Sequence, residues 1–240
     1  MSNTVDGGPG EPQDEDRFSA ANAPAVEQGA LTKEQYRVLS MMVEDGKQKL
    51  LMMHGGGGCG KSFAITTAVA EIKKRGGTVA CCCPTGVGAS HIPDGRTSHS
   101  MWLAHLNDVN TVKMIDDMFR KLGDKRLRAV VIDEVSMLAA HFLILLDKRP
   151  RAMYSTTLPL GGISILLVED FQQASVVKGH DLYRVMYSDA KGVEVQARAP
   201  FEKFTVIEME QQIRAADCEK HRTRLAAMHV LPKNYPSGTR

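Results

Sequence analysis

A glycine-rich segment that ends in a lysine and a serine carries the residue types best suited to chemistry. It reads Gly55-Gly56-Gly57-Gly58-Cys59-Gly60-Lys61-Ser62 and fits the pattern G-x-x-x-x-G-K-[ST] between an apolar run and a helix-like stretch. Glycine backbone lets N–H groups surround a phosphate, and the following helix turns its positive end toward it. Lys61 can reach the outer phosphates and the Ser62 hydroxyl can ligate Mg²⁺. We predict that all eight residues bind ATP with Mg²⁺; a plain strand-to-helix turn is the alternative.

A pair of acids, Asp133 and Glu134, follows the apolar run 129–132. Acids at the carboxyl end of a parallel strand face the ligand crevice of an α/β sheet. We therefore expect Asp133 to hold Mg²⁺ together with Ser62, and Glu134 to orient and deprotonate an attacking water. The alternative is that the pair only begins a helix at Ser136, where acids are favoured by the helix dipole.

The elements that must position these residues follow from the hydrophobic pattern. Apolar runs predict buried strands, and amphipathic stretches between them predict helices. The expected strands are 49–53, 78–83, 128–133, 163–168 and 204–209; the expected helices are 33–45, 61–75, 110–121, 136–148 and 218–229. Pro150 is expected to stop the helix that begins at 136. Strands that are buried on both faces and alternate with helices predict an α/β domain with a mostly parallel sheet and helices on both faces.

Composition and charge argue against a membrane protein and against a secreted, disulfide-linked protein. The 240 residues contain no apolar run near the roughly 20 that a membrane span needs, and the acidic, glycine-rich start is unlike a secretory signal or a mitochondrial presequence. Residues 1–30 carry a net charge of −5, so the rest of the chain carries +7. We expect residues 1–29 to be a disordered acidic tail. The five cysteines lack the spacing of a disulfide framework or a zinc site, which indicates a reducing compartment.

The order and spacing of several motifs resemble those of the petite-integration-frequency (PIF-type) DNA helicases. These are superfamily-one enzymes that move five-prime to three-prime on single-stranded DNA. The similar segments are 31–35, 55–62, 84–89, 95–100, 133–138, 159–162, 170–173 and 208–217. The resemblance implies a RecA-like P-loop NTPase domain over residues 30–217. It also implies ATP and single-stranded DNA as partners, no membrane, and a location in the nucleus rather than the cytoplasm.

The resemblance also implies roles for residues outside the glycine-rich loop. Gln35 would read the adenine edge, although a capping box with Thr32 accounts for it equally well. Gln173 would sense the γ-phosphate, and Arg214 would neutralise charge that develops during hydrolysis. Because Gln173 must emerge between the loop and the acid pair, strand 163–168 is expected between strands 50–53 and 129–132.

The expected DNA contacts come from the same resemblance. Thr85, Gly86 and His99 would lie along the DNA track; His99 could equally be an ordinary loop histidine. The similarity ends near residue 217, and motifs V and VI have no counterpart in the 240 residues. We therefore expect a first motor half in which residues 218–240 begin a second domain, with slow hydrolysis and no strand separation by itself.

Two functions other than a helicase motor stay open, the first because of departures from the motif pattern. Glu169 stands where the family has a glycine, within the region that leads to Gln173. A degenerate nucleotide-binding module without helicase activity is therefore one alternative. A small phosphotransferase of the nucleoside-kinase type is the other, disfavoured because we find no arginine-rich lid in the sequence.

Overall fold

The computed structural model describes residues 31–44, 46–102, 126–170, 200–211 and 213. In chain order their elements are α1 (Lys33–Val43), β1 (Leu50–His54), α2 (Lys61–Lys74), β2 (Val79–Cys83), α3 (Gly86–Ser90), β3 (Arg96–Thr97), α4 (Ser98–Met101), β4 (Ala129–Ile132), η3 (Val135–Met137), α6 (Ala140–Met153), η4 (Pro159–Gly162), β5 (Ser164–Glu169) and β6 (Thr205–Glu208). The expected tail 1–29 and the expected helices 110–121 and 218–229 lie outside these residues. None of the helices within them is long and apolar enough to cross a membrane.

The six strands form one sheet in the order β3-β2-β4-β5-β1-β6, and each neighbouring pair is parallel. The predicted α/β fold is therefore confirmed, as is the position of β5 between β1 and β4. Because the strands are parallel, their carboxyl ends share one edge of the sheet. The segments that follow β1, β4 and β5 meet at that edge, where the sequence places its glycine-rich loop and its acid pair.

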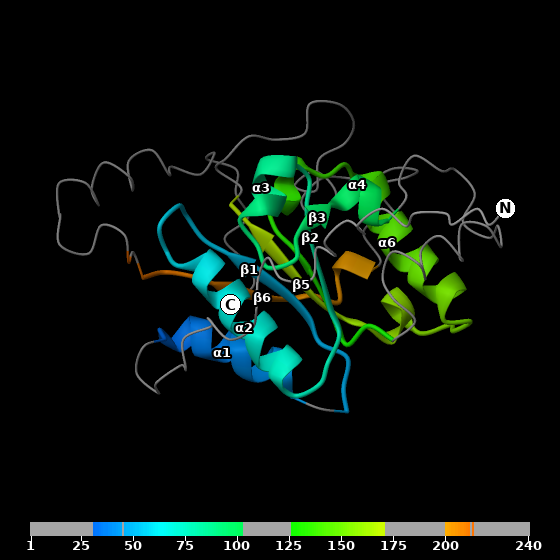
Figure 1. Ribbon diagram of the computed structural model, residues 1–240, viewed down its shortest axis with the longest axis horizontal. Coiled ribbons are helices and arrows are strands. Elements are labelled where there is room, and N and C mark those ends of the chain that lie inside the picture. The colour runs from blue at the N-terminus through cyan, green and yellow to red at the C-terminus, as the bar shows by residue number, and fades with distance from the viewer. Residues whose placement is uncertain (1–30, 45, 103–125, 171–199, 212, 214–240) are drawn as a thin grey trace, which may run out of the picture.

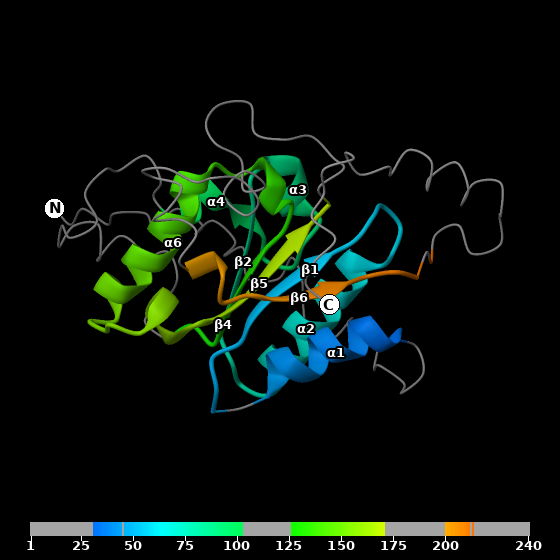
Figure 2. The same cartoon turned by 180° about the vertical axis from the view of Figure 1, so that it is seen from behind.

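Helices cover both faces of the sheet, as Figures 1 and 2 show: α1 and α2 lie side by side, and α6 lies on the other side. Strand side chains alternate between the two cores. In β1, Met52 belongs to the core under α6, whereas Leu51 and Met53 belong to the core under α2. Burial on both faces explains why these strands appear in the sequence as continuous apolar runs.

The start of α1 has the predicted capping box. The Thr32 hydroxyl accepts a hydrogen bond from the Gln35 backbone N–H at 3.2 Å, and the Gln35 side-chain oxygen accepts one from the Thr32 N–H at 2.9 Å. Two backbone donors that the helix itself leaves unpaired are satisfied in this way. The helix ends at Val43, slightly earlier than the hydrophobic pattern predicts.

The prediction for the helix around Pro150 is wrong at both ends. A short 3₁₀ turn occupies Val135–Met137, α6 begins only at Ala140, and the helix continues through Pro150 to Met153. Proline disrupts a helix because it lacks an N–H and crowds the preceding turn. Here it lies in the last turn of α6, buried against the η4 loop at Gly161, and this packing offsets the single lost hydrogen bond.

Replacing Gly161 by alanine should destabilise the fold by about 3 kcal/mol. Gly161 has φ +66°, and an added Cβ would lie 2.6 Å from the Cβ of Pro150. The backbone conformation costs about 1–2 kcal/mol for a residue with a Cβ, and overpacking adds about 1–3 kcal/mol. Urea denaturation measures the free energy of unfolding. Gly46→Ala is the matched control because Gly46 has φ +84° but open space around it; equal losses in the two variants would contradict the contact with Pro150.

Candidate nucleotide-binding site

The glycine-rich loop connects β1 to α2 at the carboxyl edge of the sheet. Gly58 and Gly60 have φ values of +88° and +82°, a region that residues with a side chain rarely adopt. The loop then enters α2 at Lys61, so the amino end of a 14-residue helix begins at the loop. This is the strand-loop-helix context in which such a loop can hold a phosphate.

At two positions of the loop, neighbouring atoms lie so close that only glycine fits. A Cβ on Gly60 would lie 2.4 Å from Nε2 of Gln35 and 2.8 Å from Cδ1 of Ile213. A Cβ on Gly55 would lie 2.7 Å from the Cβ of Met209. By contrast, an added Cβ on Gly57 would meet nothing within 4 Å. The loop is therefore held closely between α1 and the segment that follows β6.

Lys61 directs its ammonium group back into the loop. Its Nζ donates to the carbonyl oxygens of Gly55 at 2.5 Å and Gly56 at 3.0 Å, and lies 3.8 Å from Oδ2 of Asp170. Asp170 is buried and directly follows β5. The sequence did not lead us to expect Asp170 as a partner of Lys61. The available signal was its position directly after β5, a strand that pairs with β4.

The acid pair lies at the same edge, directly after β4. Asp133 donates its backbone N–H to the carbonyl of Cys82 at 2.9 Å, and its Oδ1 accepts from the Glu134 N–H at 2.9 Å. Burial raises the pKa of Asp133, an effect that this hydrogen bond partly opposes. Glu134 has φ +51° and ψ +43°, a left-handed conformation that is costly for a non-glycine residue and is found most often at functional sites.

The Glu134 side chain points to the turn between β2 and α3. Its Oε2 accepts from the Cys83 thiol at 3.3 Å and from the Thr85 hydroxyl at 3.5 Å. Burial raises the pKa of Cys83 to about 12, so this thiol remains a donor at neutral pH. Thr85 also caps α3, because its Oγ1 accepts from the Gly88 N–H at 3.0 Å. The sequence gave no sign that Cys83 would contact Glu134.

Gln35 contacts the loop from α1. Its side-chain Nε2 donates to the carbonyl of Gly60 at 3.2 Å while its Oε1 is held by the Thr32 N–H. Both ends of the buried amide are therefore used, and Gln35 ties the glycine-rich loop to the first turn of α1. Its adenine-reading role stays a prediction.

The remaining predicted residues are less closely associated with the loop. Gly86 begins α3 next to Thr85, and His99 is exposed on α4 with its ring centroid 6.3 Å from that of Phe142. Gln173 and Arg214 lie outside the described residues. The structure thus brings Lys61 and the acid pair to one edge of the sheet, and it leaves the DNA-contact assignments as predictions.

Glu169 brings an unexpected buried carboxyl group to this edge. It is the last residue of β5, its exposed fraction is 0%, and neither carboxyl oxygen has a well-formed hydrogen bond within the described part of the chain. Burial raises its pKa to about 8 from an ordinary value of 4.5, although interaction with Ser136 and the charge of Lys61 oppose the shift. A carboxyl group of this kind is protonated and neutral at pH 7.

Replacing Glu169 by glutamine should change how stability depends on pH. Between pH 4.5 and about 8 the unfolded chain loses this proton while the folded chain keeps it, so the parent becomes less stable as pH rises. The full penalty, on the order of 5 kcal/mol, is reached above pH 8 and is absent below pH 4.5. Urea denaturation at pH 5, 7 and 9 should show Glu169→Gln gaining stability over the parent as pH rises. Glu210→Gln, at an exposed position, is the control. The prediction would be wrong if the free energy of unfolding of Glu169→Gln depended on pH in the same way as that of the parent.

Comparison with known proteins shows to which family the chain belongs. A sequence model of the PIF1-like helicase family matches residues 30–229. The chain belongs to the PIF1-like helicase family. The family resemblance that the motifs carry is therefore confirmed over most of the chain.

Individual members of the PIF1-like helicase family are similar at modest identity. The chain is 28% identical over 177 residues to the ATP-dependent DNA helicase RRM3 of Saccharomyces cerevisiae, covering 70% of this chain and 23% of that protein. It is 27% identical over 201 residues to the ATP-dependent DNA helicase PIF1 of Trypanosoma brucei brucei, covering 83% of this chain and 19% of that protein. The chain thus spans about a fifth of the length of these relatives.

Solved structures of Pif1 helicases share the fold. The crystal structure of Pif1 from Candida albicans superposes with a TM-score of 0.58 at 24% identity, covering 75% of this chain and 40% of that one. Pif1 from Bacteroides in complex with ADP-AlF3 and single-stranded DNA gives a TM-score of 0.56 at 19% identity, covering 78% and 44%. The parallel sheet described above therefore has the RecA-like fold of these helicases.

Proposed function

We propose that this chain is a nucleotide-hydrolysing motor domain of an ATP-dependent DNA helicase that moves five-prime to three-prime on single-stranded DNA. The observation that carries the proposal is the meeting of Lys61, Asp170 and the pair Asp133-Glu134 at one sheet edge around a glycine-rich loop. Membership of the PIF1-like helicase family supports the same activity. We place its action in the nucleus, in repair, recombination or telomere maintenance of DNA.

Nucleotide binding would begin at the loop. Phosphate oxygens are stronger acceptors for an ammonium group than carbonyl oxygens are. They would replace the carbonyls of Gly55 and Gly56 as partners of the Lys61 Nζ. The buried Asp170 carboxylate, 3.8 Å from Nζ, would hold the Lys61 side chain toward this edge.

The oxygen donors at this edge suit Mg²⁺, which is typically held by one or two protein oxygens together with nucleotide phosphates. Asp133 and the Ser62 hydroxyl are the residues that would hold it. No cluster of three or more His, Cys, Asp or Glu side chains in the described ranges could hold a metal by itself. When bound, Mg²⁺ supplies positive charge to the β- and γ-phosphates.

Glu134 would act as the base that orients and deprotonates water. Donors from Cys83 and Thr85 fix its carboxylate, and they belong to the turn where DNA contacts are predicted. A DNA strand that displaced Thr85 would alter the hydrogen bonds of the base itself. This connection offers a direct physical route by which DNA could change the rate of hydrolysis.

Single-stranded DNA should therefore stimulate ATP hydrolysis by the chain. The experiment measures ATP turnover with Mg²⁺ while single-stranded DNA is added, with double-stranded DNA of equal length as control. A chain that binds ATP but never hydrolyses it, with or without DNA, would instead be a degenerate nucleotide-binding module. Failure to bind ATP at all would overturn the site.

A further inference from the structure

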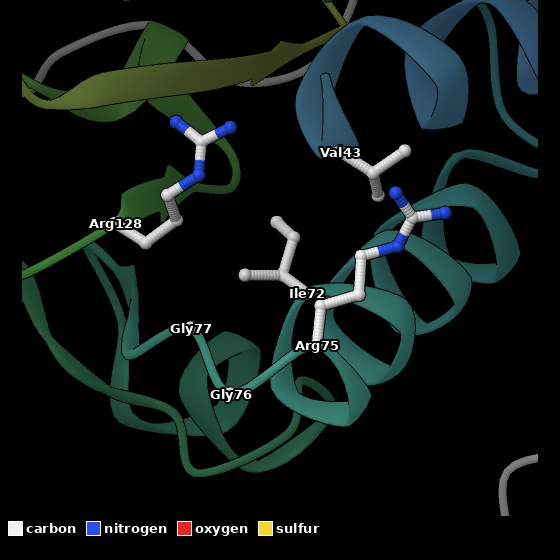
Figure 3. A pocket seen from close by; sticks show the side chains of 6 residues that line it. All are labelled: Val43, Ile72, Arg75, Gly76, Gly77 and Arg128. Atoms are coloured by element: carbon white, nitrogen blue, oxygen red, sulfur yellow. The ribbon is translucent and has the colours of Figure 1, made fainter. Parts of the chain in front are cut away.

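The first turns of α1 and α2 meet at the glycine-rich loop. Nε2 of Gln35 in α1 donates to the carbonyl oxygen of Gly60, the residue that directly precedes α2, at 3.2 Å. At the other ends of the same two helices, Val43 and Ile72 line a hollow of about 120 Å³, which Figure 3 shows from close by. The helices therefore run side by side from the loop to this hollow, with Gln35 at the loop end of α1 and Val43 at the far end.

The side-chain amide of Gln35 has its partners within the protein. Its exposed fraction is 1%. Its Oε1 accepts from the Thr32 N–H at 2.9 Å, and its Nε2 packs so closely on Gly60 that a Cβ there would lie 2.4 Å away. A glutamine that reads an adenine edge presents its oxygen and its nitrogen together to the base. Here the oxygen is directed at Thr32 and the nitrogen at Gly60, and burial covers the rest of the amide.

The Gly60 carbonyl sets the direction of the first peptide of α2. It also accepts from the Ala64 N–H at 3.1 Å, so it begins the hydrogen bonds of the helix. The Gly60 carbonyl and the Lys61 N–H belong to one planar trans peptide and point in opposite directions. The Lys61 N–H is among the first N–H groups of α2, which have no partner within a helix and can bind an anion. A bond that holds the carbonyl therefore also aims this N–H.

Glycine at this position makes such a restraint important. Gly60 is the N-cap residue of α2, has φ +82°, and has no side chain that could hydrogen-bond to the helix. Glycine changes its backbone conformation at little cost, so the 60–61 peptide keeps its direction through the bonds that surrounding residues make to it. The bond from Gln35 is one of them. A loop that is held in its binding conformation binds more tightly, because it loses less freedom when the ligand arrives.

We propose that Gln35 is a positioning residue of the glycine-rich loop. It fixes the 60–61 peptide for a phosphate and takes no part in recognising the base, so its contribution is the same for every nucleotide and for a polyphosphate without a base. The inference rests on the proposed function, because it requires that nucleotides bind at this loop. It differs from the adenine-reading role that the motif resemblance implies for the same residue.

The test compares ligands with and without a base. Gln35→Met keeps the length of the side chain but has no donor for the Gly60 carbonyl. Calorimetric titration with ADP, GDP and inorganic pyrophosphate, each with Mg²⁺, should show all three affinities falling by the same factor, about 2- to 10-fold for one hydrogen bond. Val43→Ala is the matched control, because it shortens a buried side chain at the far end of the same helix. It should lower the free energy of unfolding and leave the three affinities unchanged.

A second readout needs no ligand. In the nucleotide-free chain, the backbone amide chemical shift of Lys61 should change in Gln35→Met and stay in place in Val43→Ala. A loss of affinity for ADP alone would overturn the inference and restore the adenine-reading role, and unchanged affinities for all three ligands would overturn it as well. So would a parent chain that binds ADP but neither GDP nor pyrophosphate. A parent chain that binds none of the three would instead overturn the proposed nucleotide site itself, and the inference with it.

Discussion

Replacing Lys61 by alanine should lower ATP hydrolysis by about 100- to 1,000-fold. The ammonium group donates to the loop carbonyls of Gly55 and Gly56 and lies 3.8 Å from the buried Asp170. Removing one preorganised donor to a developing charge costs about 10² to 10³ in rate. Nucleotide affinity should fall as well, because Lys61 interacts with the phosphates before the reaction begins.

Two measurements separate these effects. Calorimetric titration gives the affinity for ADP and ATP, and turnover at saturating ATP gives the rate. Lys148→Ala is a suitable control, since Lys148 is an exposed lysine on α6 far along the chain from the loop. An alanine variant at 61 that bound nucleotide as tightly as the parent and hydrolysed it at the same rate would show that the phosphate site lies elsewhere.

Replacing Glu134 by glutamine should remove hydrolysis while preserving nucleotide binding. Glutamine has the shape of glutamate and can still accept from Cys83 and Thr85, but it cannot take a proton from water. Loss of a general base costs about 10² to 10⁴ in rate. We expect the affinity for ATP to change by less than about threefold, because Glu134 contacts the β2–α3 turn rather than the glycine-rich loop.

Single-turnover hydrolysis with the variant and the parent measures the effect on the chemical step. Exposed Glu210→Gln serves as the matched control. If Glu134→Gln lost affinity and rate equally, Glu134 would act in binding rather than as the base. If it lost neither, the acid that activates water would have to be sought elsewhere, with Asp170 as the next candidate at this edge.

Local patterns predicted much of the fold and the core of the site. The capping box of Thr32 and Gln35, the glycine-rich loop and the strand before Asp133 depend on residues that are close in sequence, so spacing was sufficient. The position of β5 between β1 and β4 was also predicted, because the γ-phosphate geometry of the family requires it. Each of these features is confirmed by the structure.

Contacts between distant segments could not be predicted in the same way. The approach of Asp170 to Lys61 and of Cys83 to Glu134 depends on how neighbouring strands align, which no short pattern records. Pro150 misled the helix prediction because packing against Gly161 compensates for the bond it lacks. Glu169 was visible as a departure from the motif, but only its complete burial shows that it is a neutral acid.

The segment after β6 is joined directly to the glycine-rich loop. Met209 packs where a side chain on Gly55 would stand, the Ile213 N–H donates to the Gly58 carbonyl at 3.0 Å, and the Ile213 side chain covers Gly60. The glycine-rich loop and the segment that leaves β6 are therefore coupled through one backbone hydrogen bond and two packing contacts. A bound phosphate that shifted the Gly58 carbonyl would have to shift Ile213 with it or break this hydrogen bond. The position of residue 213 would then report the state of the loop.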